Sequence, residues 1–126
     1  MDSDLELKRI LIIDDEPDAL IILRVLLEKH GATVFCACNG REGFDVARRE
    51  NLDLILSDIS MPGVNGWDFI RLIRQFPQTA KIPVVAVTAH TDSYYRRRAS
   101  AAGFRHFIAK PINARNFVEG LKPMLV

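Results

Sequence analysis

Short apolar runs alternate with amphipathic segments along the whole chain. Each run is short, and the segment after it spaces its apolar residues as a helix does. The runs cover residues 10–13, 33–37, 52–57, 82–87 and 105–109. This alternation is typical of repeated strand–helix units that build a parallel sheet. The sequence therefore predicts an α/β fold, a doubly wound five-stranded parallel sheet with five helices.

Residues that begin and end helices support this interpretation. Pro17 suits the first turn of a helix that reaches about His30 and stops at Gly31. Asn113 is a typical cap for the last helix, and Pro123 should disrupt that helix's final turn. The helix boundaries thus fall between the predicted strands.

Length and charge exclude several classes of protein. A chain of 126 residues fits one domain, and we expect a single domain over 1–126 with a core of about 8–125. The net charge of +1 recruits neither nucleic acid nor an anionic membrane. The apolar stretch at 82–89 is far too short to span a bilayer, and the acidic N-terminus lacks the apolar segment of a signal peptide. We expect a cytoplasmic protein with no direct nucleic-acid or membrane partner.

Polar residues follow the predicted strands at the point where each strand ends. They are Asp14 and Asp15 after the first strand, Asp58 after the third, Thr88 after the fourth and Lys110 after the fifth. Doubly wound sheets bind ligands beyond the carboxyl ends of their strands, so these side chains should converge. Three carboxylates in one place repel one another unless a cation is present, and oxygen ligands favour Mg²⁺. A carboxylate, a metal, a lysine and a hydroxyl together indicate phosphoryl transfer.

Four motifs, in order along nearly the whole chain, resemble the signatures of response regulator receiver domains. They are Ile13-Asp14-Asp15-Glu16, Asp58-Ile59-Ser60-Met61-Pro62-Gly63, Val87-Thr88-Ala89 and Lys110-Pro111. The resemblance implies the flavodoxin-like fold of chemotaxis regulators, with strand order 2-1-3-4-5. Phe104, after Gly103, stands where the family usually has a small residue.

The resemblance also implies a role for each site residue. Asp58 would be the phosphoacceptor, and Thr88 and Lys110 would contact the phosphoryl group. The Lys110–Pro111 bond would be cis, and Phe107 would be the aromatic switch. The Mg²⁺ ligands would be Asp14 (partly through water), Asp15, Asp58 and the Ser60 backbone carbonyl.

The same resemblance implies a phosphorelay protein and not a conventional enzyme. The donor would be a sensor histidine kinase or a histidine phosphotransfer protein. The phosphorylated surface would signal to a downstream protein or output domain, and the protein would dephosphorylate itself slowly. Ser60 and His90 should tune the lifetime of the phosphoryl group.

Two other classes share part of this pattern. A flavodoxin-like cofactor binder shares the strand order, but the acidic loop at 14–16 would repel a flavin phosphate. A phosphatase of the haloacid dehalogenase type needs an acid two residues after the nucleophile, where this chain has Ser60. Tyr94 to Arg98 could bind nucleic acid, although a helix with solvated arginines is the simpler interpretation.

Two further expectations concern surfaces. In the first helix, an inward stripe of five apolar residues leaves Ile21 and Val25 on another side, where a helical partner that carries the histidine could dock. The stripe comprises Ala19, Ile22, Leu23, Leu26 and Leu27. Cys36 and Cys38 are expected to be small buried residues.

Overall fold

The computed structural model describes residues 4–61 and 63–125 of the chain. Its centre is a sheet of five parallel strands in the order β2-β1-β3-β4-β5. The strands are β1 (Arg9–Ile13), β2 (Thr33–Ala37), β3 (Leu54–Ser57), β4 (Val84–Thr88) and β5 (His106–Ala109). The predicted fold class and strand order are confirmed. The predicted domain over 1–126 includes residues 1–3, 62 and 126, which lie outside the described part.

Five α-helices connect and cover the strands, and a short 3₁₀ turn follows the last. They are α1 (Pro17–Lys29), α2 (Gly40–Arg49), α3 (Gly66–Gln75), α4 (Ser93–Ala102) and α5 (Ala114–Leu121), with η1 (Lys122–Leu125). Asn113 caps α5 as predicted, and α5 gives way to η1 just before Pro123. Within the described ranges, no helix is long and apolar enough to cross a membrane.

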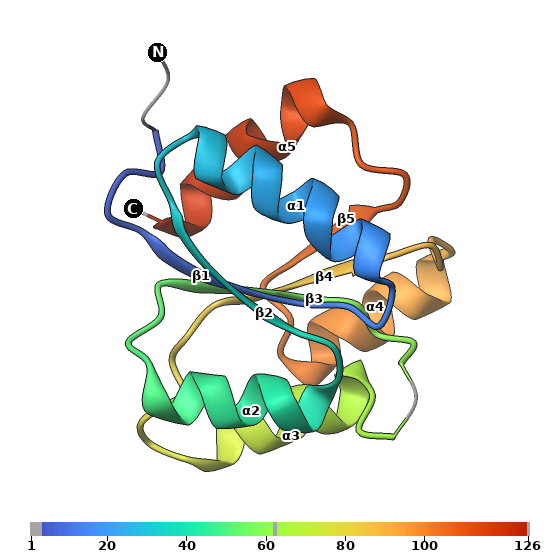
Figure 1. The fold of residues 1–126 in the computed structure, drawn as a ribbon. Coiled ribbons are helices and arrows are strands. Elements are labelled where there is room, and N and C mark those ends of the chain that lie inside the picture. The colour runs from blue at the N-terminus through green and yellow to red at the C-terminus, as the bar shows by residue number, and fades with distance from the viewer. Residues whose placement is uncertain (1–3, 62, 126) are drawn as a thin grey trace.

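The helices form two layers, one on each face of the sheet (Figure 1). One buried cluster joins β1, β3 and β4 to α1 and α5, and includes Leu23, Leu27 and Phe117. The second joins the opposite face to α2, α3 and α4, and includes Phe44 and Phe69. Because both faces are covered, the central strands are apolar almost throughout.

Three strands begin later than the sequence predicts, and for β5 the difference is a single residue. Leu52 and Asp53 belong to a loop, where the Asp53 carboxylate accepts a hydrogen bond from the Arg9 backbone N–H at 2.8 Å. In the other case, β4 begins at Val84 because Pro83 has no N–H to donate to the sheet. All three differences lie at the ends of strands remote from the polar residues.

The structure corrects two expectations about side-chain burial. Ile22 is 55% exposed, so the inward stripe of α1 is made instead by Leu20, Leu23, Leu26 and Leu27. Cys38 is exposed beyond the end of β2, and Cys36 is only partly buried. Cys38 follows the strand, so the alternation of a strand does not govern its side chain. Ile21 and Val25 are exposed, as predicted.

Candidate functional site

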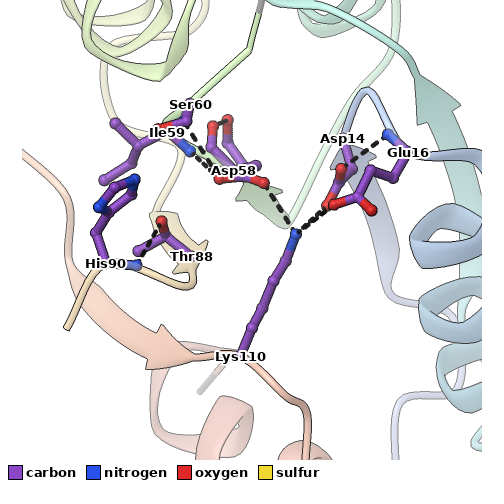
Figure 2. Close-up of polar contacts among 9 residues, drawn as sticks. Asp14, Glu16, Asp58, Ile59, Ser60, Thr88, His90 and Lys110 are labelled. Atoms are coloured by element: carbon purple, nitrogen blue, oxygen red, sulfur yellow. Dashed lines mark hydrogen bonds and ion pairs between the residues drawn. The ribbon is translucent and has the colours of Figure 1, made fainter.

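A lysine at the end of one strand is hydrogen-bonded to two acids at the ends of two other strands. Lys110 Nζ lies 2.7 Å from Asp14 Oδ2 and 2.9 Å from Asp58 Oδ2 (Figure 2). Asp14 is 1% exposed and Asp58 7%, so both carboxylates are largely removed from water. Parallel strands made this convergence predictable, since their carboxyl ends share one edge of the sheet.

Backbone groups fix the orientation of Asp58. Asp58 Oδ1 accepts hydrogen bonds from the N–H of Ile59 at 2.7 Å and of Ser60 at 3.3 Å. Its other carboxylate oxygen faces Lys110 (Figure 2). The side chain is therefore held at both oxygens before any ligand arrives.

Gly66, the first residue of α3, supports this loop. A Cβ at Gly66 would lie 2.5 Å from Ile59 Cα and 2.6 Å from the Asp58 carbonyl oxygen. Only glycine allows α3 to start this close to the acid-bearing loop. In the sequence Gly66 indicates only a turn, and nothing in it shows that the residue touches the site.

The site carries more negative than positive charge. Asp14, Glu16 and Asp58 each offer a carboxylate oxygen, and these oxygens lie within 4.8 Å of one another. Burial lowers the pKa of Lys110, but its hydrogen bonds to Asp14 and Asp58 outweigh that effect and raise it. Lys110 therefore stays charged, yet one ammonium cannot neutralise three carboxylates. The donor set fits a hard divalent cation such as Mg²⁺.

The composition of this group differs from the sequence prediction in one respect. Glu16 was considered there only as part of an acidic loop, yet its Oε1 lies 3.8 Å from Lys110 Nζ. Asp15, predicted as a direct metal ligand, is exposed and is not a member of the group of three carboxylates. Neighbouring residues in a turn cannot all face one point, and the sequence does not say which one does.

Thr88, at the end of β4, lies on the side of Asp58 away from Asp14 (Figure 2), and Phe107 lies in the neighbouring strand β5. Thr88 is 1% exposed, and its hydroxyl accepts a bond of 3.3 Å from the His90 N–H (Figure 2). Phe107, in β5, is partly buried, with the Arg96 guanidinium 4.6 Å from its ring centroid. The Lys110–Pro111 bond is cis, as the resemblance implied.

A largely apolar cavity of about 510 Å³ opens beside Lys110. Its walls come from the first turns of α1 and from the segment after β5, and they include Ala19, Ile22, Lys110, Pro111 and Ile112. Ile22 therefore faces this cavity and not the core, which explains its exposure.

Two further predictions concern Phe104 and the arginines of α4. Phe104 is buried and meets Trp67 edge-on, with ring centroids 6.0 Å apart, so the core accommodates the larger residue. Ala99 is buried and Tyr95 packs on the core, whereas the arginines at 96–98 are exposed, as the simpler interpretation of this helix predicts.

Comparisons with known proteins agree with this geometry. The profile of the response regulator receiver domain matches residues 10–122. The protein PilH of Pseudomonas aeruginosa is 38% identical over 120 residues, covering 93% of this chain and 97% of PilH. The chemotaxis protein CheY4 of Vibrio cholerae superimposes with a TM-score of 0.89 at 26% identity, covering 94% and 98% of the two chains.

A further solved structure has a similar fold. It is the receiver domain of a Pseudomonas aeruginosa sensor histidine kinase, with a TM-score of 0.86 at 25% identity, and it covers 94% of this chain and 97% of that one. That structure has a magnesium ion coordinated in its active-site cleft. The acidic group described above is typical of such a site.

Proposed function

The chain belongs to the response regulator receiver family, a family of phosphorelay signalling modules that are not conventional enzymes, and from this premise we propose that Asp58 is its phosphoacceptor. The observation that carries the proposal is the position of Asp58, which is buried, oriented by two backbone N–H groups and paired with Lys110. Of the acids around it, Asp14 bonds Lys110 from the neighbouring strand end and Glu16 is exposed.

We assign Mg²⁺ to the side chains of Asp14, Asp15 and Asp58 and to the Ser60 carbonyl, with Asp14 partly through water. Asp15, which lies outside the group of three carboxylates, would have to turn toward the ion as it binds. When bound, the ion would neutralise charge on the phosphoryl oxygens and on the acceptor carboxylate. Glu16 is close enough to the same group to add charge at its edge. These residues come from the turns after β1 and β3, which adjoin in the sheet.

The transfer itself asks the protein for positioning and charge neutralisation. A carboxylate oxygen of Asp58 forms a bond to phosphorus as the bond from phosphorus to the donor's imidazole nitrogen breaks. The imidazole leaves with that electron pair and later takes up a proton. Lys110 would shift from the carboxylates to a phosphoryl oxygen, and the Thr88 hydroxyl would donate to another.

Signalling follows from the change at Thr88. Its hydroxyl would turn toward the phosphoryl group and leave space into which Phe107 can move, which alters the surface of α4 and β5 for a downstream protein or output domain. Slow hydrolysis of the acyl phosphate would end the signal. Ser60 and His90, both exposed beside Asp58, would tune its lifetime.

The cavity beside Lys110 and the exposed face of α1 suit the phosphoryl donor. Ile21, Ile22 and Val25 are 60%, 55% and 59% exposed on one helix, an unusual apolar surface for a single element. A helix that carries the phosphohistidine, from a sensor histidine kinase or a histidine phosphotransfer protein, could pack against this surface. Its imidazole would then reach the end of β3.

Intact-mass spectrometry after incubation with acetyl phosphate and Mg²⁺ tests the assignment of Asp58. The wild-type protein should gain one phosphoryl group that hydroxylamine removes, and the Asp58→Asn variant should gain none. Asp45→Asn, an exposed change on α2, is the matched control and should label normally. Normal labelling of Asp58→Asn, or a phosphate that resists hydroxylamine, would contradict the proposal.

A further inference from the structure

A second cavity, of about 420 Å³, lies between α3 and α4 and shares no residue with the acidic site. We call it the arginine cleft. Its principal lining residues are Trp67, Ile70, Arg71, Arg74, Arg98 and Ala102. No carboxylate lines it within the described part of the chain. Its volume falls in the range of small-molecule pockets.

Arg74 places a fixed positive charge at one end of the cleft. Its Nη1 donates to the carbonyls of Ala80 at 3.0 Å and Ile82 at 2.9 Å, and its Nη2 donates to the Gly103 carbonyl at 2.9 Å. These acceptors are neutral, and no described carboxylate lies within ion-pair distance of Arg74. Burial, and then the nearby Arg105, lower the pKa of Arg74.

Arg98 and Arg71 add charge that is equally little compensated. The Arg98 guanidinium lies 4.2 Å from the Trp67 ring centroid, and among the described residues it has no carboxylate partner. Arg71 reaches Asp68 only at 3.8 Å, with side chains 70% and 47% exposed. Such a pair contributes little and breaks easily. Both guanidiniums are therefore available to an anion.

The chemistry of the lining narrows the class of ligand. Guanidinium groups bind phosphate through two parallel hydrogen bonds, and their flat faces also stack on aromatic rings. The Arg98 guanidinium already lies over the Trp67 ring, and both residues line the cleft. The volume of about 420 Å³ holds a molecule of mononucleotide size. A net charge of +1 for the whole chain does not suit a long polyanion.

We propose that the arginine cleft binds a mononucleotide, with its phosphate between Arg71 and Arg98 and its base stacked on Arg98. The site is independent of Asp58 and of the metal ligands. Binding there would make the receiver responsive to a soluble nucleotide as well as to its phosphoryl donor.

Nucleotide binding can be followed by the intrinsic fluorescence of Trp67, because it is the only tryptophan in the chain. Adenosine and guanosine 5′-monophosphate are titrated in EDTA, so that the acidic site holds no metal, with calorimetry as a second readout. At least one nucleotide should saturate the protein below about 1 mM, and Arg98→Gln should weaken it about tenfold or more, the equivalent of about 1.4 kcal/mol. Arg97→Gln, the exposed neighbour outside the cleft, should change the affinity less than about twofold.

Three results would overturn the proposal. The first is no saturation by either nucleotide up to about 5 mM, well above the affinity predicted. The second is an equal loss of affinity in Arg97→Gln and Arg98→Gln, which would show diffuse attraction and not a site. The third is inorganic phosphate binding as tightly as the nucleotides, which would show that no base is recognised. Thermal unfolding of both variants checks that they fold.

Discussion

The two sides of Asp58 are held very differently. On one side, Lys110 bonds Asp14 and Asp58 at 2.7 and 2.9 Å, and both acids are largely buried. On the other, the Thr88 hydroxyl takes part, among the described residues, only in a bond of 3.3 Å with the His90 N–H, and the exposed Arg96 guanidinium lies 4.6 Å from the Phe107 ring centroid. We call these the lysine side and the threonine side.

This difference matches the two tasks of the proposed function. Phosphoryl transfer needs groups that are in place before the reaction, because preorganised charge costs nothing to reorient. Signalling needs an element with two arrangements of similar free energy. Short, charged, buried contacts provide the first, and long or exposed contacts permit the second. Each prediction below changes a residue on one side of Asp58 and names the measurement that tests what that side contributes.

The largest effect is expected from Lys110→Met, which breaks the lysine side. Asp14 and Asp58 would remain buried with no cation, and such a loss costs about 3–5 kcal/mol of unfolding free energy without metal. Mg²⁺ should restore more stability in the variant than in the wild type, because the ion then replaces the lost charge. Labelling by acetyl phosphate should fall by about 100-fold or more. Urea unfolding with and without Mg²⁺, and intact mass, measure these effects.

Lys122→Met is the control, since Lys122 pairs with Asp4 and Glu119 at the surface. It should leave labelling and the Mg²⁺ response unchanged. An equal loss of stability in the two variants, or normal labelling of Lys110→Met, would show that the lysine side does not depend on its buried charge.

The next effect is expected from Gly66→Ala, which disturbs the lysine side through its backbone. The new methyl group would clash with the Asp58–Ile59 backbone, as the distances of 2.5 and 2.6 Å show. Overpacking of this kind costs about 1–3 kcal/mol and should also slow labelling of Asp58. Gly120→Ala is the control, because the residue is in α5 and, apart from its chain neighbours and the backbone of its own helix, no atom of the described residues lies within 4 Å of a Cβ there. In a helix that change should be neutral or stabilising.

Much of the fold could be predicted, since it depends on local patterns. Alternating apolar runs and capping residues such as Asn113 indicate elements one at a time, and parallel strands bring their ends together. The convergence of Asp14, Asp58 and Lys110 follows from that topology alone. Each of these residues directly follows a strand, so its position is fixed by the end of that strand.

Contacts between elements could not be predicted from the sequence. Ile22 has the spacing of a core residue, yet it faces a surface cavity because Leu20 occupies the inward position. Glu16 and Asp15 are adjacent acids, and only the path of the turn decides which one approaches Asp58. Gly66 matters through backbone brought close by the start of α3, and no local pattern reports such a distance.

A smaller effect concerns pH, and it tests how much the charge of Lys110 contributes to stability on the lysine side. Because the folded-state pKa of Lys110 is raised above its ordinary value of 10.5, its charge contributes stability that is fully present below that value. The contribution is lost as pH rises through the folded-state pKa. The wild type should therefore lose unfolding free energy more steeply than Lys110→Met above pH 10.5, measured by urea unfolding without metal. Parallel curves for the two proteins would contradict the assignment.

The smallest effect is expected from Arg96→Gln, on the threonine side. Arg96 lies over the Phe107 ring, and its Nε also donates to the Thr91 carbonyl at 3.3 Å. It thus ties the loop after β4 to the proposed switch residue in the unphosphorylated arrangement. A cation–ring contact at an exposed site is worth about 0.5–1 kcal/mol. Its loss should favour the phosphorylated arrangement by about two- to fivefold.

That shift should appear as tighter binding of beryllofluoride, a mimic of the phosphoryl group, because a ligand binds more tightly when its preferred state is more populated. Arg97→Gln removes the same charge from α4 without touching Phe107, so its affinity should match the wild type. The unfolding free energy of Arg96→Gln should fall by no more than about 1 kcal/mol, the worth of the lost contact, and the Mg²⁺ response should stay the same in both variants, since the lysine side is intact. If Arg96→Gln binds the mimic no better than Arg97→Gln, Arg96 does not hold the switch, and the looseness of the threonine side must come from Thr88 and His90 alone.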